Sequence, residues 1–331
     1  MLIDNRLKLI ILITVIITSL FILPANSRQQ KNIFLLFSKP AQMNQEYFLD
    51  LSTLLKTNTE QYNFSAVNIN KLTSEGLNKK INAIDSCVIS IDQDSLEAVL
   101  AVRSQQAIFS TGVSQIELDN LFYQYQQFST RFSGIYSGQS FKRQLFLAKV
   151  INHESKNVTV IFGRQSRYYL SEYKKTSEQL LFNLSFEILR QQEPVLQSFY
   201  RINPTGGFLM ILNEAHIYSI QNLQSLLISS YKKQIPMIGS KKSDTKIAAL
   251  ASVYTPLNLL AKEAAEGVLD LCQKNKAMPL KYSQHYKVNI NKEIAKHLNY
   301  SHLDEKKLQL EIARLEGQSI KRLQMEKANE K

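Results

Sequence analysis

The chain has 331 residues and a formal net charge of +12, with 44% hydrophobic and 21% charged residues. This composition excludes a disordered chain and leaves room for two core-bearing units. No lysine- and arginine-rich block alternates with aromatic residues, so a nucleic-acid partner is not indicated. We attribute the positive charge to a general richness in Lys, Asn, Gln and Ile, and not to a specific anionic partner.

The N-terminal residues 1–27 are typical of an export segment. Arg6 and Lys8 precede an apolar run at 9–23, and the small residues Ala25 and Ser27 follow it. This order is that of a cleaved signal peptide, and the run is shorter than the ~20 residues that a membrane-spanning helix needs. The alternative is an uncleaved anchor that tethers the protein to the inner membrane. Either interpretation predicts an exported, periplasmic protein.

From residue 33 onward, short apolar runs alternate with stretches in which apolar residues recur at helical spacing. This alternation predicts parallel sheets with helices on both faces, in two tandem α/β units. The strands expected in the first unit are Ile33–Phe37, Phe64–Ile69, Cys87–Ile91, Ala107–Ser110 and Ser133–Tyr136. Those expected in the second unit are Val158–Phe162, Ser185–Leu189, Phe208–Leu212 and Ile235–Gly239.

The stretch from 236 to 298 contains two well-marked helices. Thr255 is a good N-cap residue, and Pro256 suits the first helical position because its missing N–H costs nothing there. Apolar residues occupy one face of this first helix, at Leu257, Leu260, Ala261, Ala264, Val268, Leu271 and Cys272. An extended run at 286–290 follows, and Asn291 is the N-cap expected for the second helix.

The segments from residue 236 onward resemble the C-terminal part of the proteins of one family, and a segment at 134–147 resembles another part of the same proteins. The segments are IPMIG, AALASVYTPLNLLAKEAAEGVLDL and YKVNINKEIAKHL, together with GIYSGQSFKRQLFL at 134–147. The pattern is similar to that of ABC transporter substrate-binding proteins, in the group that includes tryptophan- and tyrosine-type binders. The resemblance extends over roughly residues 32–300. It implies a type I periplasmic-binding-protein fold, in which two Rossmann-like lobes are joined by a hinge of crossing strands.

The resemblance also implies the domain limits. We expect 28–135 plus 250–300 to form the first lobe, and 136–249 to form the second. The crossings between the lobes are expected near Ser133–Gly138, Lys241–Lys246 and Ala249–Tyr254.

Residues 301–331 are expected to form a charged C-terminal helix or tail. Leu308, Ile312 and Leu315 are spaced as one helix face, which favours packing of that stripe on the body of the protein. A coiled-coil contact with a partner is the alternative. It is disfavoured because fewer than three clean heptads are present.

Candidate binding residues follow from the expected strand order. Ligands of open α/β sheets bind beyond the carboxyl ends of the strands, and two facing lobes would line one cleft with those ends. Arg164 or Lys39 is a candidate to hold a carboxylate, and Tyr136 or Tyr254 to stack on a flat ring. For each position the alternative is a solvated loop or a helix cap. The full set is Ser38, Lys39, Asp92, Gln93, Thr111, Tyr136, Arg164, Gln165, Asn213, Glu214, Ser240 and Tyr254.

The two cysteines, Cys87 and Cys272, allow two interpretations. In an exported protein they can form a disulfide. We favour the alternative of two small buried hydrophobic side chains, one in a strand and one on an apolar helix face. The cysteines and five scattered histidines lack the spacing of a metal site, and we expect no metal or cofactor.

The chain contains no G-x-S-x-G, P-loop or H-E-x-x-H motif, so an enzyme is not expected. We predict an exported solute-binding protein that captures a small polar molecule, such as an amino acid, and delivers it to the permease of an ABC importer. The alternative is a sensor or accessory protein of the same fold, with a degenerate cleft, that signals to a membrane partner.

Overall fold

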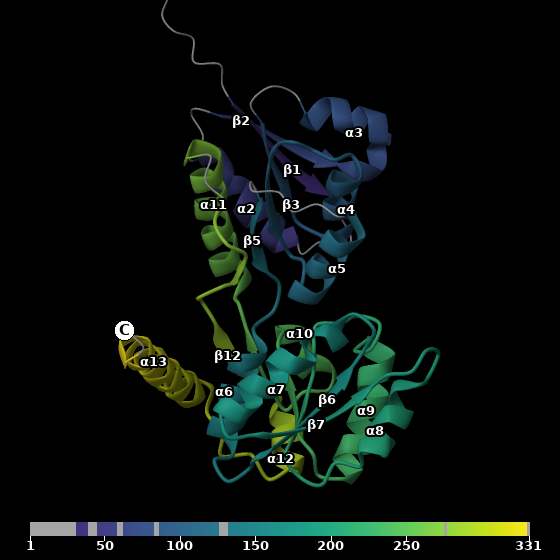
Figure 1. Ribbon diagram of the computed structural model, residues 1–331, viewed down its shortest axis with the longest axis vertical. Helices are drawn as coiled ribbons and strands as arrows, with labels where there is room; N and C mark the ends of the chain where they lie inside the picture. The colour runs from purple at the N-terminus through teal and green to yellow at the C-terminus, as the bar shows by residue number, and fades with distance from the viewer. Residues whose placement is uncertain are drawn as a thin grey trace, which may run out of the picture.

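The computed structural model describes residues 31–38, 45–57, 62–82, 86–125, 132–274 and 277–329. They form two lobes, each built on a six-stranded sheet, and Figure 1 shows one lobe above the other. The predicted α/β architecture with two lobes is confirmed. The expected export segment at 1–27 lies outside the described residues. Within the described part of the chain, no helix combines the length and the apolar character needed to cross a membrane.

The first lobe has a parallel sheet in the order β11-β5-β4-β3-β1-β2. Its three central strands β3, β4 and β5 are buried along their whole length, as expected for a sheet covered on both faces. The strands are β1 (Lys31–Phe37), β2 (Tyr62–Asn68), β3 (Ser86–Ser90), β4 (Ala107–Thr111), β5 (Phe132–Tyr136) and β11 (Lys281–Tyr282).

Helices cover both faces of this sheet (Figure 1). One face packs against α2 (Gln45–Thr57) and α11 (Leu257–Lys274). The other packs against α3 (Ser74–Ile81), α4 (Gln93–Ala101) and α5 (Gln115–Tyr125), with the short helix η1 (Ile69–Lys71) beside them.

The second lobe repeats this plan with one antiparallel strand. Its sheet has the order β12-β10-β9-β8-β6-β7, in which only β12 runs antiparallel to its neighbour among the paired strands described. The strands are β6 (Asn157–Phe162), β7 (Asn183–Ile188), β8 (Phe208–Met210), β9 (Met237–Gly239), β10 (Ala251–Tyr254) and β12 (Lys287–Ile290). The helices are α6 (Phe141–Ile151), η2 (Ser166–Tyr169), α7 (Leu170–Gln179), α8 (Val195–Ile202), α9 (Ile220–Lys232), α10 (Lys242–Ile247), α12 (Lys292–His297) and α13 (Glu305–Asn329).

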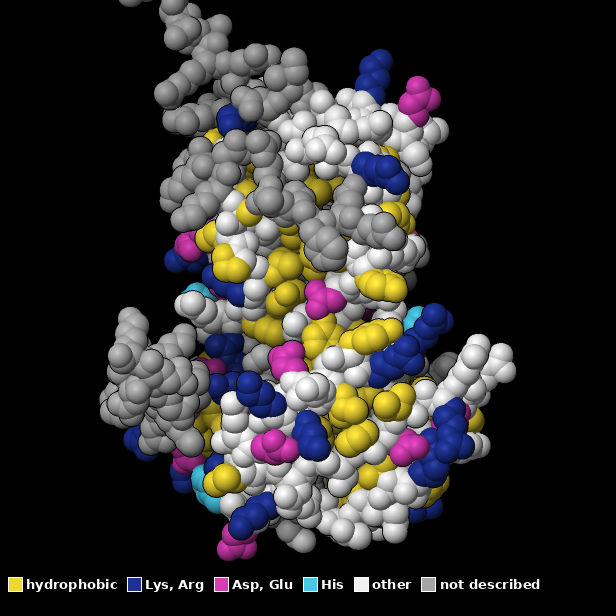
Figure 2. Space-filling model, viewed as in Figure 1, with side chains coloured by type: hydrophobic (Ala, Val, Ile, Leu, Met, Phe, Trp, Pro, Cys, Tyr) yellow, Lys and Arg dark blue, Asp and Glu magenta, His cyan; other side chains and the backbone are white. Residues whose placement is uncertain are grey.

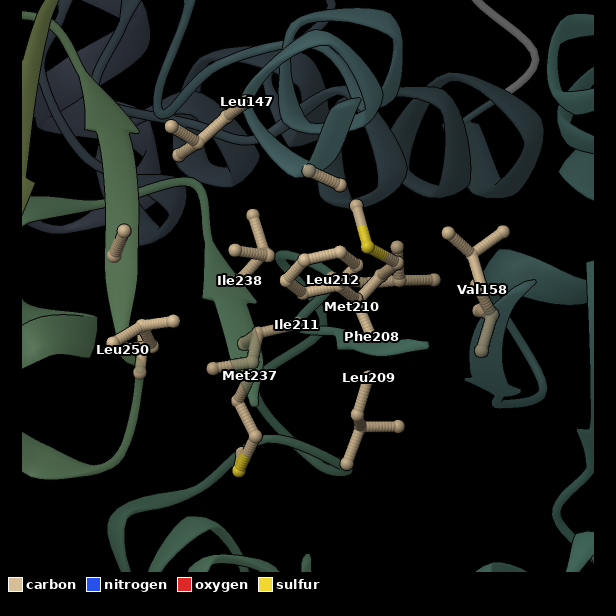
Figure 3. Close-up of a cluster of buried hydrophobic side chains, with 14 of the residues drawn as sticks. Leu147, Val158, Phe208, Leu209, Met210, Ile211, Leu212, Met237, Ile238 and Leu250 are labelled. Carbon is tan, nitrogen blue, oxygen red and sulfur yellow. The ribbon is translucent and has the colours of Figure 1, made fainter. Parts of the chain in front are cut away.

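The core of the second lobe lies on both faces of its central strands. Figure 3 shows side chains of the β8 and β9 segments, such as Phe208 and Ile238, with Leu147 of α6 and Val158 of β6 around them. All four side chains are at most 1% exposed. The run FLMIL, predicted from sequence as a buried strand, therefore packs helices on both sides of the sheet.

Three segments cross between the lobes. The first, 137–140, leads from β5 to α6, the second, 255–256, leads from β10 to α11, and the third, 283–286, leads from β11 to β12. The first overlaps the expected crossing at 133–138 only at residues 137–138, because Phe132–Tyr136 forms β5 of the first sheet. The second directly follows the predicted crossing at 249–254. The expected crossing at Lys241–Lys246 is wrong. Lys241 is the N-cap residue of α10, and Lys242–Lys246 lie within that helix, which packs on strands of the second lobe.

The stretch 250–300 is divided between the lobes, unlike the predicted assignment to the first lobe alone. Helix α11 and strand β11 pack on the first sheet, whereas β10, β12 and α12 belong to the second lobe. The helix α11 begins at Leu257, one residue later than predicted, and the Pro256 carbonyl accepts from the Leu260 amide at 2.9 Å. The predicted cap at Asn291 is confirmed, since its side chain accepts from the Ile294 amide at 3.0 Å.

The C-terminal helix α13 packs one stripe on the second lobe. Leu308 and Ile312 are buried in its core, with Leu315 partly buried beside them. The Glu305 carboxylate accepts from the Ile290 amide of β12 at 2.9 Å. The predicted packing of this apolar stripe on the body is confirmed.

The interpretation of the cysteines as unpaired hydrophobic side chains is wrong. Cys87 of β3 and Cys272 of α11 form a disulfide, with their Cα atoms 5.9 Å apart. Both side chains are buried in the core between α11 and the first sheet. Helical spacing correctly placed Cys272 on the apolar face of α11. Burial of both cysteines on facing surfaces is what brings the two sulfur atoms together.

Candidate ligand-binding cleft

A cavity of about 810 Å³ lies between the lobes. It is lined by the carboxyl ends of strands in the first lobe, by two crossing segments, and by α10 and β12 of the second lobe. Its polar and charged lining residues are Ser38, Glu46, Tyr47, Asp92, Gln93, Asp94, Ser137, Ser240, Lys241, Lys242, Ser243, Lys246, Tyr254, Thr255, Asn258 and Lys287.

Asp92 joins the ends of two strands at this cavity. One carboxylate oxygen accepts from the Ser95 amide at 2.7 Å and caps α4, which follows β3. The other oxygen accepts from the Ser38 amide at 2.9 Å, directly after β1. Strands β1 and β3 are parallel neighbours, so a single side chain in this position fixes both of their ends.

Two glycines shape the floor of the cavity. Gly112 has φ +78°, and a Cβ there would lie 2.3 Å from the Ile91 carbonyl oxygen. Gly138, in the first crossing, has φ +79°, and a Cβ would come within 3.3 Å of the Asn213 and Ser240 side chains. Both positions therefore require glycine, because other residues are strained at these angles and would intrude on neighbouring atoms.

The walls of the cavity carry opposite charges. Lysines 241, 242, 246 and 287 line the side of the second lobe, and the carboxylates that line the cavity are Glu46, Asp92 and Asp94 on the first lobe. Asp244, beside the lysines, is buried and points inward, where it accepts from the amides of Ser240 and Lys241 at 2.9 Å each. Burial raises the pKa of Asp244.

Tyr254 offers a half-buried ring between these walls. The Lys242 ammonium lies 5.7 Å from the centre of that ring, and partial burial raises the pKa of the Tyr254 hydroxyl. Tyr47, by contrast, is almost fully buried and shares a hydrogen bond of 2.7 Å with Thr111. Burial raises the pKa of Tyr47 strongly, so its hydroxyl remains neutral.

Five of the twelve residues predicted from sequence line this cavity, namely Ser38, Asp92, Gln93, Ser240 and Tyr254. Thr111 is buried next to it and faces Tyr47. Lys39 lies outside the described residues.

The other predicted residues do not line the cavity. Tyr136 packs in the core, with its ring centre 5.0 Å from that of Tyr282, and burial raises its pKa to about 12. Asn213 donates to the Ser137 carbonyl at 3.2 Å and so holds the first crossing.

Glu214 is buried and accepts from the amides of Gln165 and Ser166 at 3.2 Å each. It thereby fixes the turn after β6. In that turn Arg164 is exposed and Gln165 is half-buried, and neither lines the cavity. Arg164 is therefore not the cation that the described cavity presents. The lysines of α10 and β12 take that place.

Several lining residues were missed by the sequence reasoning. Lys241 and Lys242 follow Ser240, the first residue after the IPMIG strand, so the rule that selected Ser240 could also have selected them. Lys287 had no such signal, because it reaches the cavity only after the chain returns to the second sheet through the third crossing.

A second contact between the lobes involves α5. The Tyr169 hydroxyl of η2 donates to the Asp119 carboxylate of α5 and lies 3.5 Å from the Gln115 carbonyl oxygen at the start of the same helix. Ile116 of α5 is buried against the core of the second lobe. Partial burial raises the pKa of Asp119, against the lowering effect of the Tyr169 hydrogen bond.

Figure 2 shows the charged side chains on one face of the protein. Among the described residues, basic side chains on the second lobe are interspersed there with acidic and uncharged ones.

Comparisons with solved structures identify the fold. A ligand-free, open structure of a substrate-binding protein with adhesive properties from Clostridium difficile is 15% identical, with TM-score 0.62 over 82% of this chain and 95% of that chain. An ABC domain in complex with L-Trp from Streptococcus pneumonia is 14% identical, with TM-score 0.55 over 81% and 95%. A conserved domain protein from Vibrio cholerae is 13% identical, with TM-score 0.55 over 82% and 95%.

At these identities the likeness shows the fold alone, which is that of type I periplasmic binding proteins. No protein-family model matches the chain, and a search of curated proteins found no match.

Proposed function

We propose that this protein is an exported solute-binding protein that captures a small polar molecule between its two lobes. The observation that carries the proposal is the cavity of about 810 Å³ to which both lobes and two crossing segments contribute. Its size falls in the range of small-molecule sites, and it lies at the carboxyl ends of the strands, where open α/β sheets bind ligands.

The charges of the walls favour a dipolar ligand such as an amino acid. A carboxylate would bind the lysines of the second lobe, and an ammonium group would bind Glu46 and Asp94 of the first lobe. Asp92 contributes less to this recognition, because its oxygens already accept two backbone amides. The Tyr254 ring would cover the flat or apolar part of the ligand.

Binding would draw the lobes together about the three crossings, since a ligand held by both walls stabilises the arrangement in which the walls are close. The closed form would then be presented to a membrane partner, which the resemblance to ABC transporter substrate-binding proteins suggests is the permease of an importer. This role fits the export segment expected at 1–27.

A thermal-shift screen of the chain from Gln29 onward tests the proposal. Amino acids, nucleosides, sugars and organic acids are the ligand classes to compare. A ligand at a hundred times its dissociation constant adds about 2.7 kcal/mol to the free energy of unfolding, which gives a clear rise in melting temperature. We expect amino acids to give the largest shifts. Absence of a shift with every class would refute solute capture and leave the accessory role with a degenerate cleft.

Two variants locate the binding site in the cavity. The double variant K242Q/K246Q removes two cations from the second-lobe wall, and we expect it to weaken binding about tenfold or more. The control K174Q removes an exposed lysine of α7, outside the cavity, and should leave the dissociation constant unchanged. Equal affinities for all three proteins would place the ligand elsewhere.

A further inference from the structure

Arg143 occupies the meeting point of the crossing segments. It lies in the first turn of α6, directly after the first crossing, and its amide donates to the cap residue Ser140 at 3.3 Å. Only 15% of its side chain is exposed. A guanidinium in such a place must have its charge and its donors satisfied by the protein.

The guanidinium contacts two of the three crossings. Its Nη1 donates to the Gln139 side-chain oxygen of the first crossing at 2.6 Å and to the Ser283 carbonyl of the third at 2.5 Å. The guanidinium carbon also lies 4.6 Å from the ring centre of Tyr286, again in the third crossing.

Gln139 extends this cluster to the remaining crossing. Its amide nitrogen donates to the Thr255 hydroxyl of the second crossing at 2.6 Å and to the His285 carbonyl of the third at 3.3 Å. Arg143 and Gln139 together therefore connect all three segments that must rotate when the lobes move relative to one another.

The charge of Arg143 is balanced from outside the hinge. Its Nε donates at 2.5 Å to Glu316, whose carboxylate belongs to the C-terminal helix α13. The preceding part of α13 is fixed to the second lobe by the buried Leu308 and Ile312. Glu316 is thus a fixed counter-charge that orients the guanidinium toward the crossings.

We propose that α13 contributes to the hinge between the lobes. Glu316 orients Arg143, which together with Gln139 holds the three crossing segments in fixed positions relative to one another. This contact thereby sets the distribution of distances between the lobes. A buried guanidinium that loses its counter-charge is strongly disfavoured and moves toward water, which would release Gln139 and Ser283 together. Glu316 and Arg143 are positioning residues on this proposal, because neither lines the cavity.

The distance between the lobes gives the direct test. Dyes are attached through Y123C on α5 and I228C on α9, at side chains that are 83% and 61% exposed in the native chain. The two native cysteines are disulfide-bonded, so the introduced thiols are labelled selectively. Single-molecule energy transfer without any ligand then reports the distribution of inter-lobe distances.

We expect E316Q to broaden this distribution and R143K to do the same, because a lysine ammonium cannot reach Glu316, Gln139 and Ser283 at once. The control E311Q removes a carboxylate from the same helix that lies 3.9 Å from His153, away from the crossings, and should behave as the wild type. Wild-type distributions in both E316Q and R143K would overturn the proposal. If E316Q fails to fold, R143K decides.

The inference rests on the proposed function only for a second readout. For any ligand that the thermal screen finds, E316Q should raise the dissociation constant about threefold or more, since a loosened hinge must be ordered on binding. Failure to find a ligand would remove the proposed function and leave the distance measurement valid. If E316Q broadens the distribution of inter-lobe distances but leaves the dissociation constant of the ligand unchanged, the expected effect of the hinge on affinity is overturned.

Discussion

At the scale of single residues, Asp92 shows how one side chain serves both the fold and the cleft. It caps α4 and holds the Ser38 amide at the end of β1, while its position after β3 places it on the wall of the cavity. The fold needs an acceptor oxygen at this position, and its negative charge adds to that of the first-lobe wall of the cavity. Substitutions that separate these two properties are therefore informative.

We predict that D92A lowers the free energy of unfolding by about 1–2 kcal/mol, because it removes a helix cap and leaves the Ser38 amide without its acceptor. D92N keeps an acceptor for the cap and should cost less. Urea denaturation of the two variants measures the difference. An equal loss of stability in both would show that the charge, and not the acceptor, carries the effect.

The contact between Asp119 and Tyr169 predicts a dependence of stability on pH. Partial burial raises the pKa of Asp119 above its ordinary value of 3.8, and the pKa of Glu172 is likewise raised, first by burial and then by Asp119. Within the interval between the ordinary and the raised pKa, the folded protein binds more protons than the unfolded chain. Stability from this contact is therefore gained as the pH falls through that interval and lost as it rises.

We expect D119N to reduce this dependence, because an asparagine oxygen still accepts from Tyr169 but carries no charge. The part that comes from the burial of Glu172 should remain. Melting temperatures from about pH 4 to 7 should show D119N gaining on the wild type as the pH rises. The control E178Q changes an exposed carboxylate on α7 and should run parallel to the wild type. Parallel curves for D119N would contradict the prediction.

At the scale of elements, the disulfide joins two elements that are far apart in the sequence. Cys87 lies in β3 and Cys272 in α11, 185 residues later, and the intervening chain includes five of the six strands of the second sheet, β6 to β10. The bond therefore ties the returning helix α11 to the sheet on which it packs. It secures the part of the first lobe that is formed by the C-terminal half of the chain.

The double variant C87S/C272S should lower the free energy of unfolding by about 2–5 kcal/mol, because a long closed loop loses much entropy in the denatured state. Urea denaturation of the variant, and of the wild type with and without reductant, measures this loss. The reduced wild type should approach the variant. Identical curves for the oxidised and reduced wild type would contradict a stabilising bond.

At the scale of the whole molecule, the chain passes between the lobes three times, and each passage is short. We infer that such short crossings would let the lobes rotate relative to one another, since most of each core packs on its own sheet, although Ile116 of α5 packs in the core of the second lobe. Opposite charges on the two cavity walls would favour closure around a ligand that satisfies both.

We predict that a saturating ligand lowers the radius of gyration measured by small-angle X-ray scattering, because closure brings the lobes together. K242Q/K246Q at the same ligand concentration should show a smaller decrease. Tight binding without any change in the radius of gyration would contradict hinge closure as the mode of capture.

The sequence by itself determined the elements and their order. Runs such as VTVIF and FLMIL mark buried strands because apolar residues there continue on both faces, and Asp92 and Asn291 mark helix starts because their oxygens satisfy free amides. These signals are local, so they survive without knowledge of the fold. They also sufficed to select Ser38, Asp92 and Ser240, which follow strands directly.

Only the tertiary structure decided which side chains meet. The pairing of Cys87 with Cys272, the return of β12 to the second sheet and the arrival of Lys287 at the cavity all join residues that are distant in the chain. The same holds for Glu214, which turned inward to satisfy two amides instead of facing a ligand. Periodicity reports whether a residue is buried, whereas contacts of this kind depend on how two separately folded surfaces approach each other.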